Sequence, residues 1–356
     1  MKITHVETFR VKVPALPGTW HSPEFGPPEW DMAPIVILQL HTDAGVTGLG
    51  EVGRGIGVEQ ALAYATRLIG QDPLALNLQQ LPIGDFFDRA VGIYEAYEMA
   101  LFDLVGKVRE MPAYQLLGGA YRDRVLVSLC SGQMTPTDAA RKASEAAAEG
   151  YTFLKMKATD TDPVVERIAA IHQAVGTAIK VVIDPMQRLW RPAVLDDLCR
   201  RLEPFYDNIQ CWEDPFTKVN LDWYQLMRQK IHFPLALHLA EGKDVIEAVK
   251  HEACDYLNLG RGMVNFGKTA AIAEAAGIPV WHGSGVGLGI SEAAILHAAA
   301  AANACTLSSD VVGEKIRRND LIVTPIQFQE GHALVPQAPG LGVSLDLDAV
   351  EQYGVK

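Results

Sequence analysis

The sequence predicts an α/β fold, a (β/α)7β TIM-type barrel with an α+β capping domain. Short apolar runs, such as those at residues 153–157 and 181–184, end in polar or charged residues. The runs recur roughly every twenty to thirty residues, which is the length of one strand and the helix that returns to the next strand. The first and last parts of the chain instead have patterns typical of antiparallel strands. In a barrel of this kind the strand ends meet at one face, where active sites form.

The strand and helix patterns divide the chain into three parts. Residues 1–122 are expected to form the capping domain, residues 123–325 the barrel, and residues 326–356 a segment that returns to the cap. A chain of 356 residues is also too long for one simple hydrophobic core.

Composition excludes several kinds of partner. The formal net charge is −12, which argues against nucleic acid or an anionic membrane, because either would need a basic face. A small carboxylate substrate is compatible with this net charge if cationic side chains or ions are concentrated in the pocket. The five cysteines are scattered without CxxC spacing, and the N-terminus lacks the apolar run of a signal peptide, so we expect a cytoplasmic protein. We also expect a homo-oligomer.

Lys155 and Lys157 lie two residues apart on a predicted strand, so both point to the same face. If that face is the barrel interior, repulsion between the two ammonium groups and their burial both lower the lysine pKa, which suits a general base. The alternative is a pair of lysines that reach solvent from a strand edge.

Carboxylates and histidines end the strands that follow. Asp184 and Glu213 end the next two strands, so they converge at the barrel mouth, where they can bind Mg²⁺ or form salt bridges with the two lysines. His238 and His282 end later strands, and a lone histidine in such a place is most often structural. Asp310 ends the last predicted strand, where it can orient a lysine or the substrate or cap the next loop.

Several motifs together resemble the enolase superfamily, in its mandelate racemase and muconate lactonizing enzyme branch. They are MPAYQLLGGAYRDRV, KMK, WEDP, AEAAGIPV and TPIQFQEGHALVPQAPGLGVSLD, and the similarity covers nearly the whole chain. The resemblance implies a capped (β/α)7β barrel that removes the proton α to a carboxylate and holds the enediolate on Mg²⁺. By position it makes Lys157 the base and Lys155 its neighbour, with Asp184 and Glu213 as the first two metal ligands.

The chain departs from the family pattern on three strands. Met186 stands where an Asn is usual after the third strand, and Gly260 where the lactonizing enzymes have a lysine on the sixth. The fifth strand ends in His238 in place of the usual Asp or Glu, with Glu241 further on. Histidine is a softer ligand than Mg²⁺ prefers, so the third metal ligand is unusual. His282 lies one residue from the expected place of a racemase-type histidine.

The resulting hypothesis is a metal-dependent dehydratase of a hydroxy acid or sugar acid. Lys157 would take the α-proton, Lys155 and the cation would stabilise the enediolate, and His282 would help to expel water. The alternatives are a racemase or epimerase that uses Lys157 and His282, and a cycloisomerase. A rival of another class is a non-catalytic or metal-free barrel that binds a small acid.

The loop at residues 14–32 is the expected determinant of substrate choice. It contains five prolines and several aromatic residues, and in the family that the chain resembles the equivalent loop closes over the barrel mouth. Trp20, His21 and Trp30, with Arg54 from a nearby turn, are the expected contacts to the distal part of the substrate. The alternative is that these aromatic side chains only pack the cap against the barrel.

Overall fold

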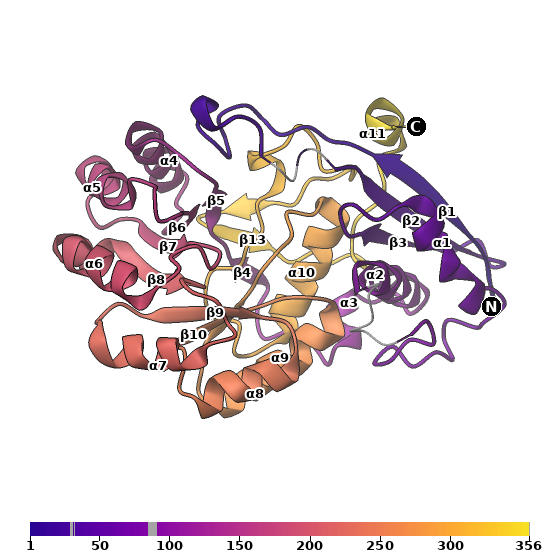
Figure 1. The fold of residues 1–356 in the computed structure, drawn as a ribbon. Helices are drawn as coiled ribbons and strands as arrows, with labels where there is room; N and C mark the ends of the chain where they lie inside the picture. The colour runs from indigo at the N-terminus through magenta and orange to yellow at the C-terminus, as the bar shows by residue number, and fades with distance from the viewer. Residues whose placement is uncertain (29–30, 32, 85–90, 356) are drawn as a thin grey trace.

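The fold was analysed in a computed structural model that describes residues 1–28, 31, 33–84 and 91–355. It has two parts, a barrel built from the middle of the chain and a cap built from its N-terminal part (Figure 1). Trp30, one of the expected substrate contacts, lies outside the described residues.

The cap is a three-stranded antiparallel sheet covered by one long helix, α2. The sheet has the order β1-β2-β3, and α2 lies across β3. Gly48 and Gly50 make this approach possible, because a Cβ atom at either position would lie 2.0 Å from a carbonyl oxygen of α2. The elements of the cap are β1 (Ile3–Val11), η1 (Pro23–Phe25), β2 (Ile35–Thr42), β3 (Thr47–Val52), α1 (Val58–Ala63), η3 (Ala65–Arg67), α2 (Val91–Val108) and α3 (Ala113–Leu116).

The barrel is a curled parallel sheet of seven strands in sequence order, β5 to β11, with helices on its outside. This order confirms the predicted fold class, since each strand is followed by a returning helix and then by its neighbour. The strands are β5 (Leu129–Ser131), β6 (Phe153–Lys157), β7 (Lys180–Asp184), β8 (Ile209–Glu213), β9 (Leu235–Leu239), β10 (Tyr256–Leu259) and β11 (Val280–His282). The helices are α4 (Pro136–Ala148), α5 (Val164–Val175), α6 (Pro192–Leu202), η4 (Glu203–Asn208), α7 (Leu221–Lys230), α8 (Gly242–Lys250), α9 (Met263–Ala275), α10 (Gly289–Ala301) and η5 (Gly313–Lys315).

The barrel closes differently from the sequence prediction. The segment 304–310, expected as the eighth strand, forms isolated parallel bridges from Cys305 to Val280 and from Ser309 to Val127, so it lies between the last strand and the first. The expected first strand is split into β5 and β4 (Arg124–Leu126), and β4 leaves the barrel to pair with β13 (His332–Leu334). Closure by scattered bridges still brings Asp310 beside the other strand ends.

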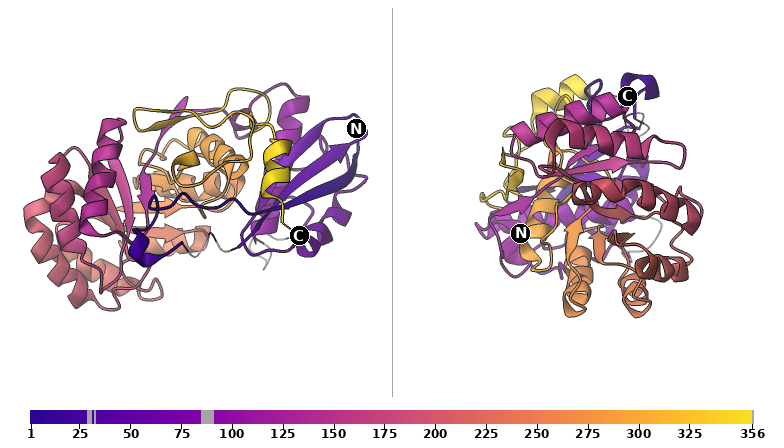
Figure 2. Two further views of the ribbon diagram at one scale, coloured as in Figure 1. Left: turned by 90° about the horizontal axis from the view of Figure 1, so that it is seen from above. Right: turned by 90° about the vertical axis from the view of Figure 1, so that its left-hand side faces the viewer.

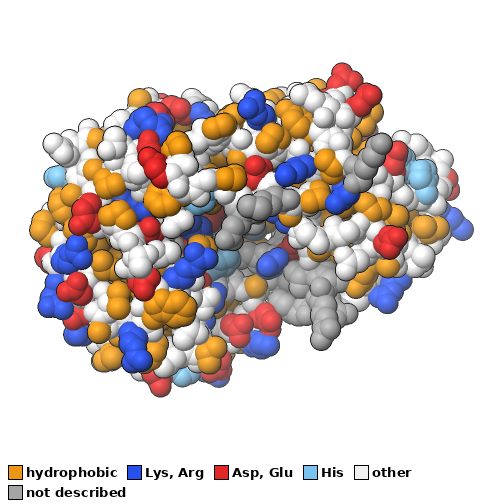
Figure 3. All heavy atoms as spheres, turned by 45° about the horizontal axis from the view of Figure 1, so that its top comes forward, with side chains coloured by type: hydrophobic (Ala, Val, Ile, Leu, Met, Phe, Trp, Pro, Cys, Tyr) orange, Lys and Arg blue, Asp and Glu red, His pale blue; other side chains and the backbone are white. Residues whose placement is uncertain are grey.

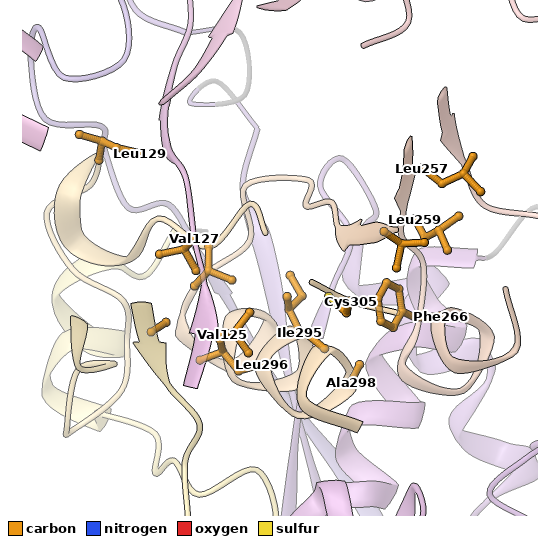
Figure 4. Packing of buried hydrophobic residues seen from close by; sticks show 14 of the residues in the cluster. Val125, Val127, Leu129, Leu257, Leu259, Phe266, Ile295, Leu296, Ala298 and Cys305 are labelled. Carbon is orange, nitrogen blue, oxygen red and sulfur yellow. The ribbon is translucent and has the colours of Figure 1, made fainter. Parts of the chain in front are cut away.

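Helix α10 joins the two parts of the molecule. An alanine-rich helix that is apolar on all sides is expected to be buried, and α10 contacts the cap strand β3 and helix α2 as well as the barrel. Figure 4 shows Leu296 of this helix beside Val125 of β4, with Phe266 of α9 on the other side. The cap and the barrel are therefore joined through one shared hydrophobic core.

The C-terminal segment runs back to the cap. It contains β12 (Phe328–Gln329), β13 and α11 (Leu347–Tyr353), and Gly354 forms an antiparallel bridge with Val11 of β1 (Figures 1 and 2). The helices of the described part of the chain include none that is long and apolar enough to span a membrane.

Candidate active site

The loops at the carboxyl ends of the barrel strands carry much of the backbone strain of the molecule. Non-glycine residues with positive φ are costly and gather at functional sites. Six of the ten in the described chain follow β7, β8, β10 or β11: Met186, Gln187, Trp190, Asp214, Arg261 and Val286. Their positions mark this end of the barrel as the functional face, which is also the face that the cap covers.

Lys155 lies at the centre of a buried cluster of carboxylates. Its Nζ is 2.7 Å from Glu213 Oε2, 2.8 Å from Asp310 Oδ2 and 3.7 Å from Asp184 Oδ2, and its side chain is 4% exposed. The ring of Trp281 faces the same ammonium group, with its centroid 5.8 Å away. Strand alternation explains the arrangement, because Lys155 and Trp281 point into the barrel.

Lys157 lies one layer nearer the mouth and forms an ion pair with Asp184, its partner in the strand register. With 25% of its side chain exposed, it is the most accessible member of the cluster. Burial is the largest single influence and lowers the pKa of Lys157, but the charge and hydrogen bond of Asp184 together with the charge of Glu213 outweigh it, so the net pKa is raised. This corrects the sequence prediction, in which crowding by Lys155 lowered the pKa. The carboxylate contact is closer and stronger than that repulsion.

The two neighbouring carboxylates differ in their acidity. Burial raises the pKa of Asp184, yet the two lysines outweigh it, so the pKa is held well below its usual range. Glu213 has its pKa raised to about 8 by burial first and then by the negative charge of Asp184. Opposite shifts in adjacent titratable groups are typical of active sites.

The later strands contribute neutral groups to the same face. The Asn258 amide donates to Glu213 Oε1 at 2.7 Å, and His238 Nδ1 lies 3.9 Å from that oxygen. Burial, together with the positive charge of Lys155, lowers the pKa of His238 and keeps the imidazole neutral. Asp214 fixes the position of His238, whose backbone N–H donates to Oδ1 at 2.9 Å.

His282 does not face the lysines, contrary to the sequence prediction. Its neighbour Trp281 points into the barrel, so alternation turns His282 to the outside, where its ring stacks on Phe266 at 4.3 Å between centroids. Its Nδ1 lies 2.6 Å from the carbonyl oxygen of Gly283, and burial lowers its pKa to about 4. These contacts place His282 away from the lysine cluster, on the second cavity between the barrel and the cap.

The carboxylates were tested as a metal site. Within the described ranges, no group of three His, Cys, Asp or Glu side chains lies close enough to hold a metal ion. Asp184 Oδ1 accepts the Met186 N–H at 2.9 Å, and Glu213 Oε2 has Lys155 2.7 Å away. The donors present do not fit the near-octahedral oxygen shell that Mg²⁺ demands.

Two adjacent cavities open between the barrel and the cap. One, of about 370 Å³, is lined by Lys155, Lys157 and Asp310 together with Trp20 and His21 of the 14–32 loop. Lys and Arg side chains and a His side chain border the hollow between the two parts in Figure 3. The structure thus brings five of the sequence-predicted site residues to one cavity.

The second cavity, of about 480 Å³, is lined by Arg54, His238 and His282. Ser284 and Gly285 line both cavities and so form the wall between them. Arg54 holds that wall by donating to the Val286 carbonyl at 2.5 Å. Arg54 and His282 therefore lie on the far side of this wall from the lysines.

The 14–32 loop is fastened to the first helix unit of the barrel. The Gly132 N–H donates to the Trp20 carbonyl at 2.8 Å, and a Cβ at Gly132 would collide with the Trp20 and His21 rings. Ser22 is fully buried and donates to Asp138 Oδ2 at 2.5 Å. Trp20 packs on apolar neighbours and lines the cavity as well, so its position is compatible with both roles considered from the sequence.

Three residues of the site were absent from the sequence-predicted set: Trp281, Asn258 and Asp214. Each lies at or next to a strand end, and the alternation of β11 and β10 places Trp281 and Asn258 inside the barrel. The signal for Asp214 was the WEDP motif, in which it directly follows Glu213.

A capped barrel with paired lysines and carboxylates at its mouth defines a class of enzymes that act on small acids. Comparison with known proteins names the class. Residues 138–349 match a family model described as enolase C-terminal domain-like, and residues 29–118 match the mandelate racemase / muconate lactonizing enzyme N-terminal domain. The chain belongs to the mandelate racemase and muconate lactonizing enzyme branch of the enolase superfamily.

Its relatives in this branch carry out different reactions. A chloromuconate cycloisomerase of Cupriavidus pinatubonensis is 28% identical, over 89% of this chain and 90% of the relative. A D-xylonate dehydratase of Haloferax volcanii is 29% identical, over 91% and 86%. The crystal structure of an N-succinyl Arg/Lys racemase from Bacillus cereus superposes with a TM-score of 0.84 at 26% identity, covering 100% and 99%. The chain is thus an enzyme of a family of lyases and isomerases, which typically uses Mg²⁺.

Proposed function

We propose that the chain takes the proton α to the carboxylate of a small hydroxy acid or sugar acid with Lys157 and eliminates water. The observation that carries the proposal is the exposure of Lys157. It is 25% exposed and lines the cavity, whereas the other four charged groups of the cluster are at most 9% exposed. A bound acid therefore meets Lys157 first.

Each group near the cavity has a chemical task in this reaction. The amine form of Lys157 accepts the α-proton, so the lysine must lose its own proton before the acid reacts. The Lys155 ammonium faces the charge that develops on the substrate carboxylate. His21 lines the same cavity and replaces His282 as the group that delivers a proton to the departing hydroxyl.

Elimination is preferred because one side of the site lacks a second base. The sixth strand offers Gly260 where a lysine would complete a racemase or cycloisomerase, and His282 faces away from the cavity of Lys157. A racemase or epimerase is the second candidate, favoured by the close superposition of the racemase from Bacillus cereus. A cycloisomerase is the third, and a non-catalytic barrel that binds an acid is the rival from another class.

Mg²⁺ as a cofactor of this particular chain is the prediction from the sequence, and the donors at the site argue against it. Asp184 and Glu213 are the carboxylates that would hold it, with His238 in the third position, and no step above passes through the metal because the donors do not fit it. The homo-oligomer also stays a prediction, for which light scattering of the purified chain is the test.

The test is exchange of the α-proton in D₂O over a panel of sugar acids, hydroxy acids, N-acyl amino acids and unsaturated diacids. A dehydratase yields a 2-oxo acid after tautomerisation of the enol, and a racemase yields deuterated enantiomer or epimer without loss of water. Exchange that needs Lys157 supports the proposal. Tight binding of an acid without any exchange would support the non-catalytic barrel in its place.

A further inference from the structure

The charged cluster contains a cation of its own. Lys155 contacts two carboxylates at hydrogen-bond distance, Glu213 at 2.7 Å and Asp310 at 2.8 Å, and has Asp184 3.7 Å away. A cation surrounded by three buried carboxylates is expected of a bound metal ion. Here the cation is the ammonium group of Lys155, which is part of the chain.

Several of the oxygens that a metal would use contact nitrogen donors. Asp184 accepts the Met186 N–H through Oδ1 and contacts Lys157 through Oδ2. Glu213 Oε1 accepts from the Asn258 amide at 2.7 Å. An ion bound to these carboxylates would have to displace the donors and lie next to two ammonium groups, which Coulomb repulsion opposes in a buried site.

Lys155 cannot easily withdraw to make room. Its side chain is 4% exposed, and the Trp281 ring stands on one side of the ammonium group. A lysine that left this position would deprive the buried Glu213 and Asp310 of their ammonium partner, which is strongly unfavourable, while Asp184 would keep only Lys157 as its cation.

The geometry points to Lys155 as a built-in cation that takes the place of the divalent ion typical of the family, so that the chain does not need Mg²⁺ at this site. The ammonium group holds Asp184, Glu213 and Asp310 together. Because Lys155 also lines the cavity of Lys157, the same charge faces an acid bound there. This role in the reaction rests on the proposed function, whereas the exclusion of a divalent ion does not.

The decisive experiment is titration of the chelator-treated full chain with MnCl₂ and MgCl₂, followed by calorimetry and by the electron paramagnetic resonance of free Mn²⁺. The wild type is expected to show no saturable binding at millimolar concentrations. Lys155→Met removes the ammonium group while keeping the length of the side chain, so it is expected to gain stoichiometric Mn²⁺ binding and a melting temperature that rises with Mn²⁺. Lys218→Met is the matched control, because in the described part of the chain Lys218 pairs with a single carboxylate, that of Asp214, and its loss opens no such site.

Two results would overturn the inference. One is stoichiometric binding of Mn²⁺ or Mg²⁺ by the wild type, and the other is a folded Lys155→Met chain that binds neither ion. A Lys155→Met chain that folds only in the presence of Mn²⁺ supports the inference. If this variant folds neither with nor without Mn²⁺, the titration of the wild type by itself decides whether the inference holds. Since no substrate is used, these results are separate from failure of the proposed reaction, which the α-proton exchange experiment reports.

Discussion

The mouth of the barrel has a charged half and a neutral half. Strands β6, β7 and β8 end in Lys157, Asp184 and Glu213, all in one network of ion pairs with Lys155. Strands β9, β10 and β11 present uncharged groups to the same face, among them the neutral imidazole of His238. The two halves share one sheet and one set of returning helices, so the difference lies in a few strand-end side chains.

The cap also makes different contacts with the two halves. The 14–32 loop lies over the charged half, where Ser22 is buried against Asp138 of α4. The neutral half is held by carboxylates of the cap, because Glu98 accepts the first N–H of helix α9 and Glu51 the N–H of Leu288 before α10. We infer that chemistry belongs to the charged half, and that the neutral half mainly anchors the cap.

The largest expected effect tests where the chemistry lies. Lys157→Ala should lower the rate of α-proton exchange by about 10²–10⁴-fold, because it removes the base. Melting temperature and circular dichroism should change little, since the side chain is partly exposed. Lys243→Ala, on an exposed residue that does not line the cavity of Lys157, is the control that should keep wild-type exchange. If Lys157→Ala and Lys243→Ala exchange the α-proton at similar rates, the reaction does not take place at the charged half.

The second effect compares stability between the halves. Asp184→Asn removes the buried carboxylate that contacts both Lys155 and Lys157, so it should lower the free energy of unfolding by about 3–5 kcal/mol. His238→Gln removes a neutral and partly exposed group and should cost less than about 1 kcal/mol. Urea unfolding of both variants measures the difference. If the two variants lose equal free energy of unfolding, the ion pairs of the charged half do not stabilise the fold more than the neutral groups do.

The charged half was largely predictable from the sequence, and the neutral half was not. Lys155, Lys157, Asp184 and Glu213 follow from strand periodicity, since alternation and the parallel order of strands fix both the face and the neighbours. The direction of the His282 side chain was not predictable, because β11 is only three residues long. In so short a run, the choice between Trp281 and His282 for the interior depends on register, which a sequence pattern does not supply.

Closure of the barrel and the pKa of Lys157 also escaped prediction. The segment at 304–310 has the apolar pattern of a strand but forms only isolated bridges, because its pairing depends on where β4 leaves the barrel. The pKa of Lys157 depends on which charged group lies closest to it. That group is Asp184, and the contact between them is set by the tertiary structure. Local pattern determined the type of the seven strands β5 to β11, and long-range packing determined these details.

A third, smaller effect concerns substrate choice over the charged half. Trp20→Phe should change kcat/KM by about tenfold for some acids and little for others, because Trp20 lines the cavity of the lysines. Trp190→Phe is the control, as Trp190 is 66% exposed and does not line that cavity. A uniform loss across the panel together with a lowered melting temperature would instead assign Trp20 to packing alone.

The smallest effect tests the anchoring of the neutral half through its pH dependence. Burial raises the pKa of Glu98 from its ordinary value near 4.5 to about 8, even though the N–H groups of Met263 and Val264 lower it. The folded chain thus binds this proton more tightly than the unfolded chain, so the stabilisation is complete below about pH 4.5 and is lost as pH rises through 8.

Between pH 5 and pH 9 the melting temperature of the wild type should therefore fall by a few degrees more than that of Glu98→Gln. The exposed Glu247→Gln, on the barrel helix α8, should keep the wild-type slope. If Glu98→Gln and Glu247→Gln show the same slope, the protonated carboxyl group of Glu98 does not anchor the cap, and Glu51 with the apolar contacts of α10 would then have to hold the neutral half.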